Sequence, residues 1–96
     1  RRAAGSHLVF QGSTLVLTSE GRGRRLRILM PPDHPRLADY LELFRVQLTR
    51  AFAPWRSVEV QEINGEPAAT SAYAAVLAAR FQVTSTAGGL RLWRRY

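Results

Sequence analysis

The sequence predicts an α+β domain whose elements follow the order β-β-β-α-β-α-β-β. Short segments in which apolar and polar residues alternate recur at both ends of the chain, as is typical of strands. One long segment and one shorter segment instead carry apolar residues at helical spacing. Turn residues separate these segments. We therefore expect mostly antiparallel strands in a curled or partly barrel-like sheet, with two helices packed on it.

The first thirty residues predict a meander of three antiparallel strands. A first strand, turn and second strand are visible in "HLVFQGSTLVLTSEG", where Leu8 and Phe10 share one face and residues 11–13 form the turn. The next turn lies at 20–24, where two glycines supply positive φ angles. Apolar residues then alternate with arginines in "RRLRILM", and prolines end this third strand.

Residues 33–52 predict the longer helix. Asp33 is a suitable N-cap, and Pro35 falls in the first turn, where its missing N–H costs nothing. The apolar stripe of this helix consists of Leu37, Leu41, Phe44, Leu48 and Phe52. Pro54 ends the helix, whose stripe we expect to lie across one face of the sheet.

The remainder of the chain predicts a strand, a shorter helix and a closing hairpin. The strand is "SVEVQEI", with its valines inward, and a strong turn signal follows at Asn64-Gly65. Ser71 or Thr70 is expected to cap the second helix. The inward residues of that helix are Tyr73, Val76 and Leu77. The hairpin pairs "RFQVTS" with "LRLWRRY" and has glycines in its loop.

Length and composition are those of a single globular domain. The chain has 96 residues, 46% of them hydrophobic, which predicts one domain spanning 1–96 with its own core. No apolar run approaches the length of a membrane span, and the first ten residues lack a signal-peptide pattern. With no cysteine, disulfides and Cys-based zinc sites are excluded, and we expect a cytoplasmic protein with no membrane partner.

The chain is strongly basic. All fourteen basic residues are arginines, and against seven acidic residues they give a net charge of +7. Such an excess is typical of proteins that bind polyanions, most often nucleic acid. A GC-rich genome would explain the choice of arginine over lysine, although it does not explain the net excess. Composition thus leaves both explanations open.

No catalytic or metal-binding constellation is evident. His7 and His34 are far apart and have no i, i+4 partner, so we expect no metal and no other cofactor. No two acidic residues are brought together in an apolar pocket, and serines and threonines lie in turns and caps without a base. The "GRGRR" segment lacks the strand–loop–helix context of a phosphate-binding loop. We therefore expect no enzyme activity from this chain by itself.

The last strand carries the strongest binding signal. Leu90 and Leu92 alternate inward, which places a second set of residues together on the opposite face: Arg91, Trp93 and Arg95. An aromatic ring between two guanidinium groups can stack on an unpaired base while the charges hold phosphates. Other arginines would extend this surface if the strands are adjacent, namely Arg22, Arg24, Arg25 and Arg27. Alternatively, Trp93 packs against another domain or a second copy, and the arginines merely flank it.

The segment "VEVQEINGEPAATSAYAAVLAARFQVTSTAGGLRLWRR" resembles the extreme C-terminus of bacterial large helicase-related (Lhr-type) superfamily 2 DNA helicases. In that family a strand is followed by an Asn/Asp-Gly-Glu-Pro turn, a Ser-led short helix, a phenylalanine and a terminal Gly-Leu-x-Leu-Arg. The matching residues here are Glu62, Ile63, Asn64, Gly65, Glu66, Pro67, Ser71, Phe81, Gly89, Leu90, Leu92 and Arg94. The sequence departs from the family at Ala72, where proline is frequent, and at Arg80, where glycine is expected.

The resemblance implies a C-terminal accessory domain of a larger helicase-like protein, detached from the ATPase motifs, which this chain lacks. It implies DNA as the ligand and other domains or copies of the parent helicase as partners. Relatives of that region include DNA glycosylase-like repair proteins, but no catalytic residue of that activity can be placed on this sequence. We therefore expect a non-catalytic module that binds DNA or RNA, with a docking or oligomerisation module as the alternative.

Overall fold

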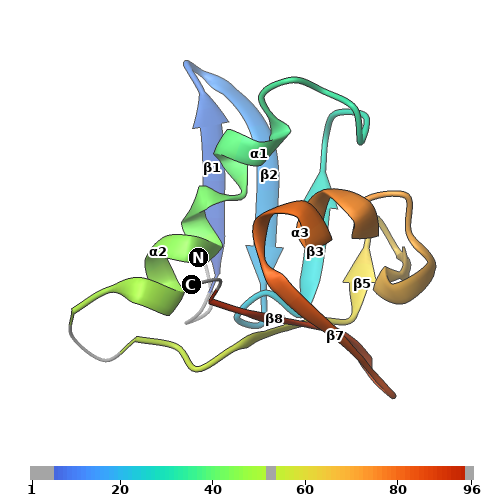
Figure 1. Cartoon of the computed structure of the whole chain (residues 1–96). Helices are drawn as coiled ribbons and strands as arrows, with labels where there is room; N and C mark the ends of the chain where they lie inside the picture. Colours follow the sequence, from blue (N-terminus) through green and yellow to red (C-terminus); the bar gives the residue numbers. More distant parts are fainter. Residues whose placement is uncertain (1–5, 52–53, 95–96) are drawn as a thin grey trace.

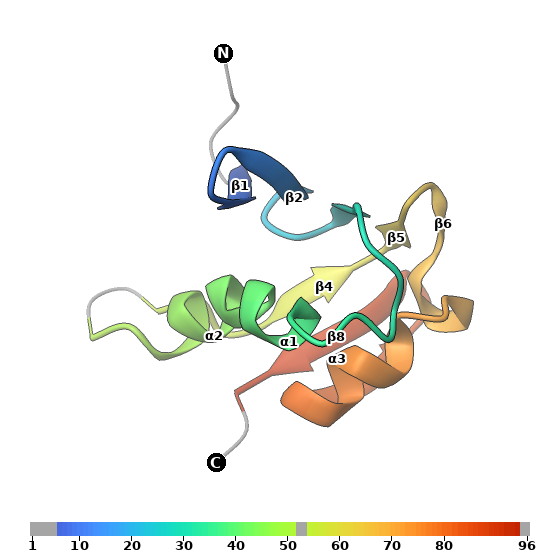
Figure 2. The ribbon, with the colours of Figure 1, turned by 90° about the horizontal axis from the view of Figure 1, so that it is seen from above.

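Two β-sheets and three short α-helices surround one core in residues 6–51 and 54–94, which are the residues that the computed structural model describes (Figures 1 and 2). The elements are β1 (His7–Gln11), β2 (Thr14–Glu20), β3 (Arg25–Ile28), α1 (Leu37–Tyr40), α2 (Glu42–Thr49), β4 (Val58–Val60), β5 (Glu62–Ile63), β6 (Glu66–Pro67), the 3-10 turn η1 (Ala68–Thr70), α3 (Ala74–Arg80), β7 (Gln82–Thr86) and β8 (Gly89–Trp93). The predicted α+β class is confirmed.

The strands divide into a larger and a smaller sheet. The larger has the order β1-β2-β3-β5-β6; its first three strands form the predicted antiparallel meander, and β5 pairs with β3 in parallel. The smaller has the order β4-β8-β7 and is antiparallel throughout, so β8 is its central strand. Mostly antiparallel pairing is confirmed. Where one curled or partly barrel-like sheet was expected, the strands are divided between two sheets, and these do not close into a barrel.

The strand predicted at 57–63 is shared between the two sheets. β4 pairs with β8, whereas β5 pairs with β3 on the other sheet. At the bend between them, the N–H groups of Gln61 and Glu62 both donate to the carbonyl of Arg24, at 2.8 and 3.0 Å. One short segment therefore ties the two sheets together at the end of the β2–β3 loop.

The helices and both sheets contribute to the core. The α1–α2 pair lies across β1 and β2, and the smaller sheet closes the core below them (Figure 1). The predicted apolar stripe is buried at Leu37, Leu41, Phe44 and Leu48. These side chains share one cluster with residues of both sheets, including Leu17, Leu26, Val58 and Leu92. Phe52, the last residue of the predicted stripe, lies outside the described residues.

The longer helix begins later than predicted, and a break divides it into α1 and α2. The expected N-cap at Asp33 is wrong: helix α1 starts at Leu37, and its N-cap position is Arg36, without a side-chain hydrogen bond. His34 Nδ1 accepts a hydrogen bond from the Arg36 N–H at 3.1 Å. Because Pro35 disfavours helical geometry at the residue before it, this segment forms a turn ahead of the helix.

The predicted turn at Asn64-Gly65 is confirmed and joins β5 to β6. Asn64 adopts a left-handed conformation with φ of 55°, which asparagine tolerates better than most residues. Its side chain reaches across to the end of β3, where Oδ1 accepts from the Ile28 N–H at 2.7 Å and Nδ2 donates to the Ile28 carbonyl at 3.1 Å. The amide thus pairs both backbone groups of Ile28, as a neighbouring strand would.

Ser71 lies in the turn that leads into α3. Its hydroxyl accepts a hydrogen bond from the Tyr73 N–H at 3.1 Å, but α3 begins at Ala74 and has no side-chain cap. Ser71 is therefore a turn residue and not the N-cap that was predicted, and Thr70 belongs to η1. The inward face is confirmed, since Leu77 is buried and the neighbouring apolar residues pack against the core.

Replacing Asn64 tests how much this turn contributes to stability. Asn64→Ala is expected to lower the free energy of unfolding by about 2 kcal/mol. The substitution removes two hydrogen bonds, and alanine tolerates the left-handed conformation less well than asparagine. Asn64→Gly retains the conformational freedom and should lose only about 1 kcal/mol. Urea denaturation followed by tryptophan fluorescence measures both. An unchanged midpoint for Asn64→Ala would contradict this role.

Candidate nucleic-acid interface

The β2–β3 loop, residues 21–24, positions two of the predicted arginines. Gly21, Arg22 and Gly23 all have positive φ angles, of 65°, 60° and 95°. The glycines were expected to adopt this conformation, whereas Arg22 was not, since arginine rarely does. Backbone strain of this kind persists where surrounding contacts enforce it, and it is concentrated at functional sites. The conformation of Arg22 thus marks this loop as a candidate functional site.

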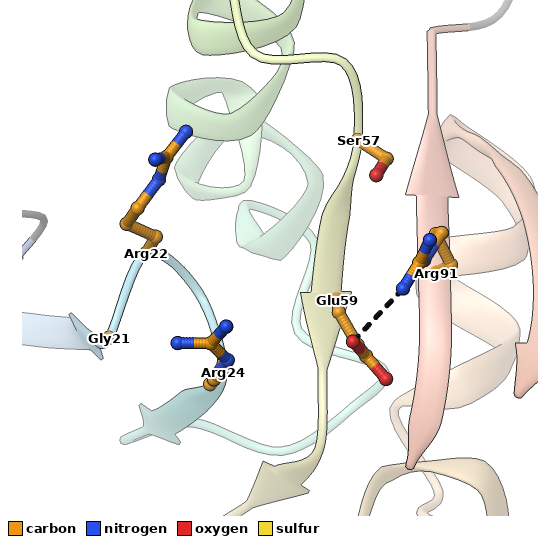
Figure 3. A pocket seen from close by; sticks show the side chains of 6 residues that line it. All are labelled: Gly21, Arg22, Arg24, Ser57, Glu59 and Arg91. Carbon is orange, nitrogen blue, oxygen red and sulfur yellow. Dashed lines mark hydrogen bonds and ion pairs between the residues drawn. The ribbon is translucent and has the colours of Figure 1, made fainter. Parts of the chain in front are cut away.

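Gly23 brings the loop into contact with the core. A methyl group at this position would overlap Val58 Cγ1 and approach Phe44 Cε1 to 3.2 Å. Only glycine allows the backbone to come so close to these two side chains. The loop therefore lies against β4, and the arginines on either side of Gly23 project from it (Figure 3).

Three arginines from two distant parts of the chain line one cleft, between the β2–β3 loop and strands β4 and β8 (Figure 3). Its volume is about 210 Å³. The residues of this cleft, hereafter the arginine cleft, are Gly21, Arg22, Arg24, Ser57, Glu59 and Arg91. Three of these six residues are arginines and one is a carboxylate, so the lining of the cleft has an excess of positive charge.

The one carboxylate of the cleft is occupied by one of its arginines. Glu59 Oε1 pairs with Arg91 Nη2 at 3.1 Å, and its Oε2 accepts from Thr86 Oγ1 at 3.1 Å. Arg91 Nε is buried without a hydrogen-bond partner. In the part of the chain that the structure describes, no carboxylate forms an ion pair with Arg22 or Arg24. Two exposed guanidinium groups of the cleft therefore lack an anionic partner there.

Trp93 lies on the same face of β8 as Arg91, as the alternation predicted. Leu90 and Leu92 are buried, whereas Trp93 is 36% exposed. Its indole N–H donates to Thr84 Oγ1 on β7 at 3.1 Å. Because β8 is the central strand of its sheet, both of its edges are paired, and a ligand can reach it only through this face.

A second hollow lies beside Trp93 and has a volume of about 290 Å³. The residues of this tryptophan pocket are Leu48, Pro54, Trp55, Arg56, Trp93 and Arg94. Trp55 was not among the predicted site residues; it lies between α2 and β4, outside every predicted helix and strand. The available signal was an aromatic residue followed by an arginine, directly after Pro54. That proline was predicted to end the longer helix, but α2 already ends at Thr49.

Arg22 connects the arginine cleft with the tryptophan pocket. It lines the cleft, and its guanidinium carbon lies 4.7 Å from the centre of the Trp55 ring, a favourable cation–π geometry. The His7 ring meets Trp55 edge-on, with 6.0 Å between the ring centres. The cleft and the pocket are thus neighbouring parts of one surface.

Two of the predicted arginines lie elsewhere. Arg25 and Arg27 point to the outer face of the larger sheet, where they line a separate hollow together with Glu20 and Glu62. Arg25 also forms an ion pair with Glu20 at 3.6 Å. Their part in nucleic-acid binding stays a prediction, but it would involve a different face. Arg95, predicted beside Trp93, lies outside the described residues.

Neither a metal-binding cluster nor a membrane-spanning helix occurs in residues 6–51 and 54–94. No group of three or more His, Cys, Asp or Glu side chains is placed there to hold a metal ion. No helix in this part of the chain has the length and apolar character needed to cross a membrane. The chemistry of the candidate site is therefore that of guanidinium groups, two indole rings and one carboxylate.

No protein-family model, curated protein or solved structure matches this chain. The resemblance to Lhr-type helicases therefore remains a prediction from the quoted motif. Most residues of that motif have a structural role: Asn64 forms the β5–β6 turn and Phe81 is buried in the core. None of the motif residues lines the arginine cleft.

A methyl group on Gly23 tests whether contact with the core holds the loop. Gly23→Ala is expected to lower the free energy of unfolding by about 2 kcal/mol or more, because the loop must move away from Val58 and Phe44. Gly21→Ala is the matched control in the same loop: its Cβ would meet Arg24 Cβ at an ordinary 3.5 Å. It should lose only about 1 kcal/mol. Equal losses in urea denaturation would contradict the role of close packing.

Proposed function

We propose that the protein is a non-catalytic nucleic-acid-binding domain whose arginine cleft holds backbone phosphates. The observation that carries the proposal is the convergence of Arg22, Arg24 and Arg91 on one cleft in which Glu59 is the single carboxylate. Like charges held together in this way repel one another, and an approaching anion relieves that repulsion. DNA and RNA present such anions at short, regular intervals along the chain.

Guanidinium groups suit this task. Each is planar, stays charged, and can donate two parallel hydrogen bonds to one phosphate. The net charge of +7 adds a long-range attraction that steers a polyanion toward the protein. Contacts to phosphates fix the position of a nucleic acid without reading its bases. We therefore expect binding through the cleft to depend little on base sequence.

Glu59 gives the cleft its geometry. It lies opposite Arg91 in the β4–β8 pair, and its two oxygens hold the Arg91 guanidinium and the Thr86 hydroxyl. A phosphate in the cleft would accept hydrogen bonds from Arg22 and Arg24 and would share Arg91 with this carboxylate. Glu59 thus positions one arginine and at the same time repels the ligand.

The resemblance to Lhr-type helicases supports the same function. It would make this domain an accessory module of a cytoplasmic DNA helicase or DNA repair protein, with DNA as its ligand and other domains or copies of that protein as its neighbours. The ATPase domains of the parent protein would move along DNA, while this domain would contribute an additional grip on the phosphates.

A second candidate function is protein docking or oligomerisation, which an exposed apolar face on β1 favours. Leu8 is 40% and Phe10 53% exposed, and β1 is an edge strand of the larger sheet. Exposed apolar side chains on an open edge are typical of surfaces that pair with another strand. Size-exclusion chromatography over a range of concentrations separates the two candidates, because nucleic-acid binding through the cleft requires no self-association.

Removing one arginine from the cleft tests the proposed function. Arg24→Ala is expected to weaken binding of a short DNA strand about fivefold at low salt and to reduce the slope of log affinity against log salt by about 1. Arg27→Ala is the matched control, because it removes the same charge from the outer face of the larger sheet. It should weaken binding less than about twofold. Fluorescence anisotropy at two salt concentrations measures both variants.

Two results would contradict this expectation. If the wild-type protein does not bind DNA at low salt, the proposed function is wrong. If Arg24→Ala and Arg27→Ala weaken binding equally, net charge attracts the nucleic acid and the cleft has no special part in it.

Neutralising Glu59 is expected to act in the opposite direction. Glu59→Gln should tighten DNA binding about twofold, because a neutral amide does not repel phosphate. The amide oxygen can still accept a hydrogen bond from Arg91 or Thr86. The gain should diminish as salt rises, since salt screens exposed charges. The same anisotropy titrations measure it, and a loss of affinity would show that Glu59 acts chiefly by holding Arg91.

A further inference from the structure

We infer that the tryptophan pocket holds one unpaired base of a single strand whose phosphates lie in the arginine cleft. The inference rests on the proposed function and extends it in two ways. It adds a second binding site, formed by Trp55 and Trp93, and it names a class of ligand, nucleic acid with at least one unstacked base.

The pocket has walls and a size suited to a flat ring. Its volume of about 290 Å³ is close to the lower end of the range for ligand pockets, which begins at about 300 Å³. Trp55 and Trp93 provide aromatic surface, and Leu48 and Pro54 provide apolar surface. A nucleobase resembles an indole ring in shape and size, and its stacking on an aromatic side chain is favourable for every base.

Both tryptophans are held in place by other parts of the protein. The indole N–H of Trp93 is bonded to Thr84 Oγ1, so it requires no polar group from a ligand. The backbone N–H of Trp55 donates to the Gln47 carbonyl at 2.8 Å, and the guanidinium of Arg22 lies over its ring. Surfaces that are fixed in advance lose little conformational freedom on binding.

The pocket and the cleft lie at the spacing of neighbouring side chains on one strand. Arg91 and Trp93 are two residues apart on the same face of β8, which places their Cα atoms about 7 Å from each other. Arg22 lines the cleft and contacts Trp55. Sites for single strands combine these two parts, a basic groove along the backbone and aromatic rings for the bases. Arg56 adds a further basic side chain at the pocket.

A duplex does not present its bases in this way. The faces of a paired base are covered by its neighbours, and its extraction costs unstacking and unpairing energy. An apolar side chain of a partner protein could also contact the two rings. The positive charge of the adjoining cleft favours a polyanion over such a partner. The structure thus points to a single strand.

The test compares two strands that differ only in their bases. One is a single strand of about eight thymidines, and the other has the same number of phosphates but abasic sugars throughout. At low salt the thymidine strand is expected to bind about tenfold more tightly than the abasic strand, because only the former can stack. A duplex carries more phosphates at a higher charge density and binds through charge alone, so Trp93→Ala should leave its affinity unchanged. Anisotropy titrations measure all three ligands.

Variants of the pocket residues test whether the difference in affinity between the thymidine and abasic strands comes from stacking on the tryptophans. Trp93→Ala should remove the tenfold preference and leave the affinity for the abasic strand unchanged, whereas Trp93→Phe should retain most of the preference. Phe10→Ala, on the exposed face of β1, is the control and should change neither affinity. Since the chain has two tryptophans, Trp55→Phe and Trp93→Phe each leave one tryptophan whose emission can be excited selectively. The thymidine strand should quench the emission of both, and the abasic strand should quench neither.

Three outcomes distinguish a failure of base binding in the tryptophan pocket from a failure of phosphate binding in the arginine cleft. If both strands bind equally and Arg24→Ala weakens both, the arginine cleft binds phosphates and the base pocket is refuted. If neither strand binds at low salt, both are refuted. If an apolar peptide shifts the tryptophan emission and the thymidine strand does not, the pocket belongs to a protein partner and the inference is overturned.

Discussion

The bend between β4 and β5 is the constraint on which the rest of the structure depends. Because one short segment pairs with β8 on one side of the bend and with β3 on the other, neither sheet can move without the other. The two N–H groups that meet the Arg24 carbonyl fix the end of the β2–β3 loop at the same point. The bend therefore helps to place the loop with Arg22 and Arg24 beside the strands with Glu59 and Arg91.

The arginine cleft concentrates unfavourable features that the surrounding contacts offset. Arg22 adopts a conformation that arginine rarely takes, and the lining of the cleft contains three arginines and one carboxylate. Both raise the free energy of the folded state. The packing of Gly23 on the core, the hydrogen bonds to the Arg24 carbonyl and the stacking of Arg22 on Trp55 oppose this cost. A strained backbone and an excess of like charge, offset by surrounding contacts, are typical of functional sites. A loop selected for stability alone would have neither.

Patterns that are local in the sequence predicted the features that are local in the structure. Asn64-Gly65 forms the turn, and the alternation along the last strand places Arg91 and Trp93 on one face, because both depend only on neighbouring residues. The division of the strand at 57–63 between two sheets was not predicted, since its two halves carry the same alternation and their partners lie far away in the chain. For the same reason no pattern revealed that Trp55 and Trp93 line one pocket. That arrangement brings together residues far apart in the chain, and no short motif encodes it. The misplaced cap at Asp33 shows that a favourable residue type does not start a helix when a following proline dictates another geometry.

The residues of the arginine cleft come from parts of the chain that are synthesised at different times. The cleft draws on the β2–β3 loop, on β4 and finally on β8, which closes the smaller sheet from the far end of the chain. Contacts between such distant segments form slowly, because a long stretch of chain must be ordered before they are made. During synthesis the β1–β2–β3 meander emerges first and can pair with itself, while its loop arginines still face solvent. A nascent chain thus presents scattered positive charge, and a defined binding surface exists only after its last strand has inserted between β4 and β7.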